Sequence, residues 1–266
     1  MLASYPELWA YTGFLFLFGA IIAVNGGGAF PPYFAPYLIW FFAGANLFGM
    51  LLNDYFDQAL DSNNPRKTKP RLSTHEYALG IAVALLSYVA IAVLFPNLYV
   101  AVWVAVAVAA NAAYSIPPLR LKEYPPFDVL GGPASYLSAV LAGYALGGGG
   151  WPDVIAAGAG IFFFSGIDLA FKTLDIEADA RGGIRTSAIL LGRKTSVLVS
   201  ALLILGAGGL ISLHNPLYGL AVLPYLAIVA ILTGANSDAA RRVLDARLPL
   251  YYCAAGFAVT VGLILS

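Results

Sequence analysis

The chain has 266 residues, of which 60% are hydrophobic and 11% are charged, whereas an ordinary soluble domain has about 25% charged residues. This composition excludes a water-soluble globular body. The 14 basic and 14 acidic residues balance, so the charge gives no indication of a nucleic-acid partner, and the single cysteine, Cys253, excludes an internal disulfide. We therefore expect an integral membrane protein.

Apolar stretches long enough to cross a membrane recur along the whole chain, because a spanning helix needs about 20 mostly apolar residues. In chain order we predict nine of them, at Trp9 to Val24, Pro36 to Leu60, Tyr77 to Phe95, Leu98 to Ser115, Val129 to Leu146, Val154 to Leu174, Thr195 to Leu213, Leu217 to Leu232 and Tyr251 to Leu265. The breaks between them contain Gly, Pro and Asn, which are typical of turns. The sequence predicts an all-α integral membrane bundle of nine transmembrane helices that forms a single domain over residues 1–266.

The basic residues indicate the orientation of this bundle. All 14 Lys and Arg residues lie in the loops after the second, fourth, sixth and eighth predicted spans, or at the end of the sixth span. With nine spans, these loops share one side of the membrane, and positively charged loops stay on the cytoplasmic side. We therefore expect a multi-pass protein of the cell membrane with a cytoplasmic N-terminus and an active site that opens to the cytoplasm.

Polar residues form a stripe at the end of two predicted spans. The stripe that ends the second span consists of Asn53, Asp54, Asp57 and Asp61. The stripe near the end of the sixth span consists of Asp168, Lys172, Asp175 and Asp179. At about 100° per residue, each stripe occupies one face of its helix. Both stripes end on the predicted cytoplasmic side, so we expect them at matching depth.

The carboxylates of these stripes call for a cation. A carboxylate at membrane depth costs about 2.5 to 3.5 kcal/mol on insertion scales, and neighbouring carboxylates also repel one another. Magnesium binds one or two carboxylates together with substrate phosphates and keeps several waters. Two facing aspartate clusters therefore indicate a diphosphate bridged by magnesium. The alternative is that each cluster is a solvated helix end that pairs with nearby Lys and Arg.

Basic residues in three predicted cytoplasmic loops supply the rest of an anion site. They are Arg66 and Lys67 after the second span, Arg120 and Lys122 after the fourth, and Arg181 and Arg185 after the sixth. Taken alone, each basic loop is explained by membrane topology. Beside the aspartates these side chains indicate phosphate ligands, because Arg and Lys stabilise the charge on a departing diphosphate.

These segments resemble the UbiA superfamily of intramembrane prenyltransferases, whose members carry an N-D-x-x-D-x-x-x-D motif and a D-x-x-x-D motif in a nine-helix bundle. The residues that match the two motifs are Asn53, Asp54, Asp57 and Asp61, and then Asp175 and Asp179. The match covers the chain in order and spacing. The segments at 117–122 and 175–186 look most like the archaeal and carotenoid-elongating branches. One departure is Tyr5 before Pro6, where many relatives have Arg, which puts an N-terminal phosphate contact in doubt.

The resemblance implies magnesium-dependent transfer of a prenyl group from an allylic prenyl diphosphate to a lipophilic acceptor within the membrane. It implies two magnesium ions held by Asp54, Asp57, Asp61, Asp175 and Asp179. It implies a diphosphate held by the six basic loop residues named above. The residues expected to serve the reaction itself are Asn53, Tyr114, Ser115 and Lys172.

Several alternatives stay open at this point. The acceptor can be a carotenoid, a glycerol lipid or an aromatic quinone precursor; we favour a long apolar acceptor, because few polar groups lie outside the aspartate clusters. Aromatic faces can stabilise the allylic cation, and the candidates are Tyr55, Tyr114, Tyr136 and Phe162 to Phe164. Other classes are a cation-coupled transporter, whose acids should lie near mid-membrane, and a CDP-alcohol phosphotransferase, whose D-G-x-x-A-R motif is absent.

Overall fold

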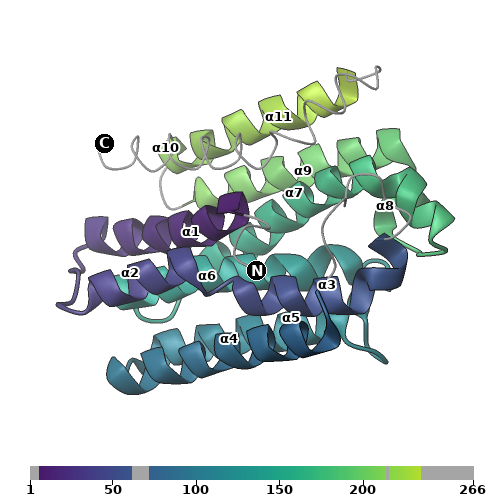
Figure 1. Cartoon of the computed structure of the whole chain (residues 1–266). Coiled ribbons are helices and arrows are strands. Elements are labelled where there is room, and N and C mark those ends of the chain that lie inside the picture. Colours follow the sequence, from purple (N-terminus) through teal and green to yellow (C-terminus); the bar gives the residue numbers. More distant parts are fainter. Residues whose placement is uncertain (1–5, 62–71, 214–215, 235–266) are drawn as a thin grey trace. The chain divides into compact units, whose positions relative to one another are not determined.

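The computed structural model describes residues 6–61, 72–213 and 216–234 (Figure 1). Side chains are described for residues 11–58, 72–213, 216 and 218–230. Within these ranges every regular element is a helix and none is a strand, which confirms the all-α class for the part of the chain described. The chain divides into two compact units, one of residues 1–120 and 138–151 and the other of residues 121–137 and 152–266.

The first unit is built from the N-terminal helices. They are α1 (Pro6–Asn25), α2 (Phe34–Ala43), α3 (Leu47–Asp61), α4 (Thr74–Leu94) and α5 (Leu98–Ser115). The second half of α6 (Asp128–Tyr144) and the short π-helix η2 (Ala145–Gly149) complete this unit. Within it, α3 packs along both α4 and α5 (Figure 1).

The second unit contains the first half of α6 and the C-terminal helices. They are η1 (Leu121–Glu123), α7 (Val154–Arg181), α8 (Ser187–Leu191), α9 (Arg193–Ile211), α10 (Pro216–Gly219), η3 (Leu220–Val222) and α11 (Leu223–Gly234). The long helices α7 and α9 lie side by side along most of their length (Figure 1).

Eight of the nine predicted spans coincide with helical segments of the structure. The ninth, Tyr251 to Leu265, lies outside the described residues, so the count of nine and the orientation of the N-terminus stay predictions. Within the described part of the chain, six helical segments are long and apolar enough to cross a membrane, namely Phe34–Gln58, Thr74–Leu94, Leu98–Ser115, Asp128–Gly149, Val154–Arg181 and Arg193–Ile211.

The second predicted span is one continuous helix in the sequence analysis, whereas the structure divides it into α2 and α3. The break falls at residues 44–46, where Gly44 has the low helix propensity of a residue without a side chain. The hydroxyl of Tyr88 on α4 donates to the carbonyl of Ala45 at 2.5 Å. A backbone group released from the helix is thereby satisfied inside the protein, as a low-dielectric environment demands.

Glycines bring α1 and α6 into close contact in the first unit. A Cβ atom added at Gly19 would collide with the carbonyl of Val140, and one added at Gly143 would collide with the carbonyl of Phe16. Small residues allow helix backbones to approach in this way where no hydrophobic force drives helices together. The contact sits against an aromatic core in which the rings of Phe16 and Phe41 stack with centroids 4.1 Å apart.

Small and hydroxyl residues join α7 to α9 in the second unit. The fully buried Ser200 donates its hydroxyl to the carbonyl of Gly166 at 2.5 Å. A Cβ atom at Gly166 would lie 2.9 Å from the carbonyl of Ser200 and 2.8 Å from Ile204. This tight pairing fixes α7, the helix that carries the second polar stripe.

Large apolar side chains cover outward faces of several helices. On α4, Leu86 and Val93 are 67% and 71% exposed, and on α9 Leu198 and Leu202 are 59% and 57% exposed. Apolar faces of this kind are unfavourable in water and suit a lipid environment.

Candidate active site

The first polar stripe lies on the C-terminal half of α3. Asn53 and Asp54 are half-buried, and Asp57 is buried with 6% exposure. The backbone of Asp61 belongs to the last turn of the helix, while its side chain lies outside the described set.

Arg120 pairs with this stripe from outside the helix. Its Nη2 lies 3.0 Å from Oδ1 of Asp57, and its Nη1 donates to the carbonyl of Phe56 at 3.3 Å. The two side chains are only 14% and 9% exposed. Arg120 also has φ +36°, a left-handed value that side chains other than glycine rarely adopt. A predicted diphosphate ligand thus contacts a predicted metal ligand in this structure.

The C-terminal end of α5 lies beside α3, because Ala112 and the adjoining Ile116 pack against a core cluster that contains Phe48 and Leu52 of α3. Ser115 is the last residue of α5 and is 1% exposed, and Tyr114 beside it is half-buried. The structure therefore brings the predicted Tyr114 and Ser115 to the end of the bundle where α3 ends, within the first unit.

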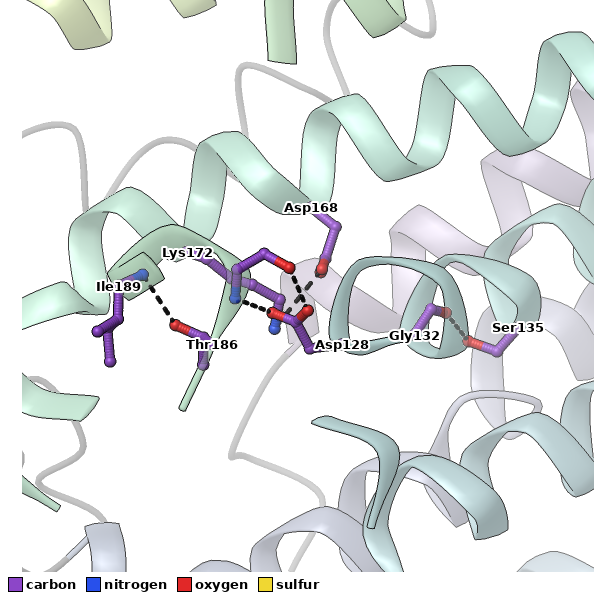
Figure 2. A network of polar contacts seen from close by, with 8 residues as sticks. Asp128, Gly132, Ser135, Asp168, Lys172, Thr186 and Ile189 are labelled. Carbon is purple, nitrogen blue, oxygen red and sulfur yellow. Dashed lines mark hydrogen bonds and ion pairs between the residues drawn. The ribbon is translucent and has the colours of Figure 1, made fainter. Parts of the chain in front are cut away.

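The second polar stripe lies on the C-terminal half of α7. Nζ of Lys172 lies 3.6 Å from Oδ2 of Asp168, an ion pair one turn apart (Figure 2). Asp175 and Asp179 are half-buried on the following turns. Both predicted metal ligands of this unit are therefore partly accessible.

A short loop joins the second stripe to α8. The helix α7 ends at Arg181, and Gly182 and Gly183 donate to the carbonyls of Ala178 and Ala180. Ile184 then donates to the carbonyl of Asp179 at 3.0 Å, so the loop turns back onto the last aspartate of the motif. The predicted diphosphate ligands on either side of this turn, Arg181 and Arg185, are both exposed.

Asp128 is a functional candidate that the sequence analysis missed. It is the first residue of α6, and it is fully buried. Its Oδ2 accepts from the backbone N–H of Ser187 at 2.8 Å, and its Oδ1 accepts from the Ser187 hydroxyl at 2.5 Å (Figure 2). The available signal was an acid directly before an apolar span, a position at which a carboxylate is costly unless it is bonded.

The other three predicted diphosphate ligands are Lys122, Arg66 and Lys67. Lys122, in η1, has only 7% exposure. Arg66 and Lys67 lie outside the described residues. The diphosphate roles of all six basic residues therefore stay predictions.

The carboxylates fit magnesium in their chemistry. Asp54 and Asp57 are three residues apart on one helix, and Asp175 and Asp179 are four apart on another, so each pair shares a face. Magnesium takes one or two such oxygen ligands together with phosphate and water. A cation, the guanidinium of Arg120, already occupies one side of Asp57. Among the described side chains no three acidic, His or Cys groups converge in either unit, so the metal roles remain predictions.

The helices, their apolar surfaces and the acidic motifs at their ends define a multi-pass membrane protein. The model of the UbiA prenyltransferase family matches residues 13–255. The chain belongs to this family and is a prenyltransferase enzyme. This result sets aside the transporter and the CDP-alcohol phosphotransferase as alternatives.

Individual relatives agree with this assignment. The chain is 28% identical to a lycopene elongase/hydratase of Haloarcula japonica over 245 residues, which are 88% of this chain and 81% of the relative. A UbiA homologue of Aeropyrum pernix in its apo form has a similar fold, with a TM-score of 0.72 and 21% identity, over 94% of this chain and 98% of that one. A UbiA homologue of Archaeoglobus fulgidus bound to GPP and Mg2+ matches with a TM-score of 0.66 and 18% identity, over 97% of this chain and 99% of that one.

Proposed function

We propose that this enzyme transfers a prenyl group from an allylic prenyl diphosphate to a long apolar acceptor of the carotenoid class, with magnesium as cofactor. The observation that carries the proposal is that an acidic motif contacts a basic loop in each unit. In the first unit the side chains of Arg120 and Asp57 pair, and in the second the backbone N–H of Ile184, between Arg181 and Arg185, donates to the backbone carbonyl of Asp179.

The aspartates would hold magnesium. The proposed ligands are Asp54, Asp57, Asp61, Asp175 and Asp179, with two ions in all. Bound magnesium supplies positive charge that neutralises the diphosphate as the allylic C–O bond breaks. The Archaeoglobus homologue, whose structure contains GPP and Mg2+, supports this choice of donor and metal.

The cationic side chains bind the diphosphate oxygens in this proposal. They are Arg66, Lys67, Arg120, Lys122, Arg181 and Arg185. Arginine presents several donors in a fixed plane, which suits two oxygens of one phosphate. Asn53 on α3, Tyr114 and Ser115 on α5, and Lys172 on α7 are the other polar residues that we propose for the reaction.

Aromatic rings shield the allylic cation once it forms. In the second unit, Phe164 is buried and lies against Tyr136 with ring centroids 6.3 Å apart, and Phe163 contacts Tyr225 at 4.6 Å. Ring faces attract a cation, and an apolar surrounding keeps water away from it. The acceptor alkene supplies the electron pair for the new C–C bond as the diphosphate leaves, so the protein need not provide a nucleophile. The positive charge that passes to the acceptor is then discharged by loss of a proton to the diphosphate or by addition of water.

The choice of an apolar acceptor rests on the lycopene elongase/hydratase relative and on the scarcity of polar side chains outside the two stripes. Membranes that contain the protein should extend lycopene when given dimethylallyl or geranylgeranyl diphosphate and magnesium, and chelation of magnesium should stop the reaction. Product analysis with a carotenoid, a glycerol lipid and an aromatic acid in parallel decides the acceptor. Turnover of the aromatic acid alone would overturn the proposed acceptor class.

The proposed site opens to the cytoplasm, because all Lys and Arg residues fall in alternate predicted loops. Reporters fused after Leu72 and Arg247 should report a cytoplasmic position, and a reporter after Gly149 should report the opposite side. A cytoplasmic signal at Gly149 would contradict the predicted topology.

A further inference from the structure

The loop between α7 and α8, which follows the second stripe, is held by hydrogen bonds at both ends. At its start, the N–H groups of Gly182, Gly183 and Ile184 bond to carbonyls of the last turns of α7. At its end, Thr186 caps α8 by accepting from Ile189 at 3.4 Å. Gly183 has φ +73°, which a glycine adopts without strain. The loop therefore has a defined path between Arg181 and Arg185.

A third contact comes from a different element, the start of α6. Both oxygens of Asp128 accept from Ser187, one from its N–H and one from its hydroxyl (Figure 2). These residues are 59 positions apart in the sequence. Asp128 is 0% exposed and Ser187 is 6% exposed, so water does not compete for these bonds.

A buried carboxylate is costly unless donors satisfy it, and a neutral residue would fill the same space at a lower cost. The partner of this carboxylate, Ser187, lies only two residues after Arg185. Figure 2 shows the side chains of Asp128, Asp168 and Lys172 near one another at the start of α6, where Lys172 pairs with Asp168. The carboxylate of Asp128 thus bonds to the residue that follows the loop with the exposed arginines, and it lies near the acidic stripe.

We propose that Asp128 is a positioning residue for the diphosphate of the prenyl donor, acting through Ser187 on the loop that carries Arg181 and Arg185. This inference rests on the proposed function. Without the Asp128 contact the loop keeps its sequence and charge but loses its fixed path, so the arginines are no longer held ready for the anion. Loss of the contact therefore weakens binding of the prenyl diphosphate donor and leaves binding of the acceptor unchanged.

Two variants weaken the contact, and two matched variants serve as controls. Asp128→Asn removes the charge and one acceptor, and Ser187→Ala removes the hydroxyl donor. The matched controls are Asp153→Asn and Ser135→Ala. Asp153 caps the other end of α7 by accepting from Ile155 and Ala156, and the Ser135 hydroxyl bonds only to the local carbonyl of Gly132 among the bonds described.

The first readout is limited trypsin cleavage of the purified full-length protein at the bonds after Arg181 and Arg185. Both test variants should be cleaved there about tenfold faster than wild type, the change expected for part of one charge-assisted hydrogen bond. Magnesium with inorganic pyrophosphate should slow the cleavage in wild type, and more weakly in the variants. The controls should behave as wild type. Cleavage of the test variants at the wild-type rate would overturn the anchoring.

The second readout is steady-state kinetics with varied donor. The KM for the prenyl diphosphate should rise roughly tenfold in each test variant, while the KM for the acceptor stays within about twofold. The donor KM of the double variant should be no higher than that of the more severe single variant, because both changes act through one contact.

A fall in kcat with an unchanged donor KM would refute the positioning role and leave the proposed function intact. Absence of transfer in wild type would instead refute the proposed function, whatever the trypsin pattern. Ser187→Ala keeps the test decisive if Asp128→Asn does not fold.

Discussion

The two polar stripes balance their charges in different ways. On α3, Asp57 pairs with Arg120, a side chain 63 residues later that belongs to another segment. On α7, Asp168 pairs with Lys172 one turn away in the same helix. The first stripe therefore depends on a tertiary contact, whereas the second has a countercharge of its own. Similar acidic motifs can thus share a chemistry while they differ in what their loss does to the fold.

The largest expected effect concerns what the two stripes share. We expect Asp54→Asn, Asp57→Asn, Asp175→Asn and Asp179→Asn each to lower prenyl transfer by at least about a hundredfold, because an amide keeps the shape but lacks the charge that a divalent ion requires. Magnesium-dependent product formation, with equal amounts of folded protein, measures this loss.

Glu177→Gln is the matched control for these variants, because Glu177 lies on α7 between two of the aspartates and is exposed. Its transfer should stay within about threefold of wild type. Sensitivity of one stripe and not the other would show that the stripes do not serve one reaction.

We expect an intermediate effect on the free energy of unfolding, which should differ between the two stripes. Asp57→Asn leaves the guanidinium of Arg120, which is 14% exposed, without this countercharge, so we expect a loss of about 1 to 3 kcal/mol in the metal-free protein. Thermal melting in detergent with a chelator measures it. The double variant with Arg120→Gln should recover most of the loss. A double variant as unstable as Asp57→Asn alone would argue against the ion pair.

The smallest effect is expected on α7. Lys172→Gln removes an ion pair of 3.6 Å within one helix, which is longer than the 3.0 Å pair of Arg120 with Asp57, and the Gln amide can still donate to Asp168. We therefore expect a loss of only about 0.5 to 1 kcal/mol. The melting temperature in the same detergent should therefore fall by less than it does in Asp57→Asn. An equal or larger fall would remove the distinction between the stripes.

Much of this fold follows from local patterns. Runs of apolar residues predict the helices, and helical spacing predicts the stripes on α3 and α7, because both signals lie within one segment. The break between α2 and α3 was not predicted. It depends on Gly44 together with a hydroxyl from Tyr88 on another helix, and hydrophobicity alone does not report such a partner.

The long-range contacts of the site could not be predicted from the sequence for the same reason. Arg120 and Asp57 were both expected near an anion, but their direct pairing requires the path of the loop after α5, including the left-handed backbone of Arg120. Asp128 was missed because its partner Ser187 is 59 residues away and neither residue forms a motif by itself. The spacing of residues along one helix shows which of them share a face. A contact between distant segments follows no regular spacing, so the sequence does not show it.

The central claim of the proposed function is that binding of magnesium with diphosphate requires both aspartate motifs. The most direct test is the melting temperature of the purified protein with magnesium, with inorganic pyrophosphate and with both. We expect the two ligands together to raise the melting temperature more than the sum of their separate effects, by linkage to the folded state. We also expect both Asp54→Asn and Asp175→Asn to abolish this joint stabilisation. A joint stabilisation that survives unchanged in either variant would contradict the claim.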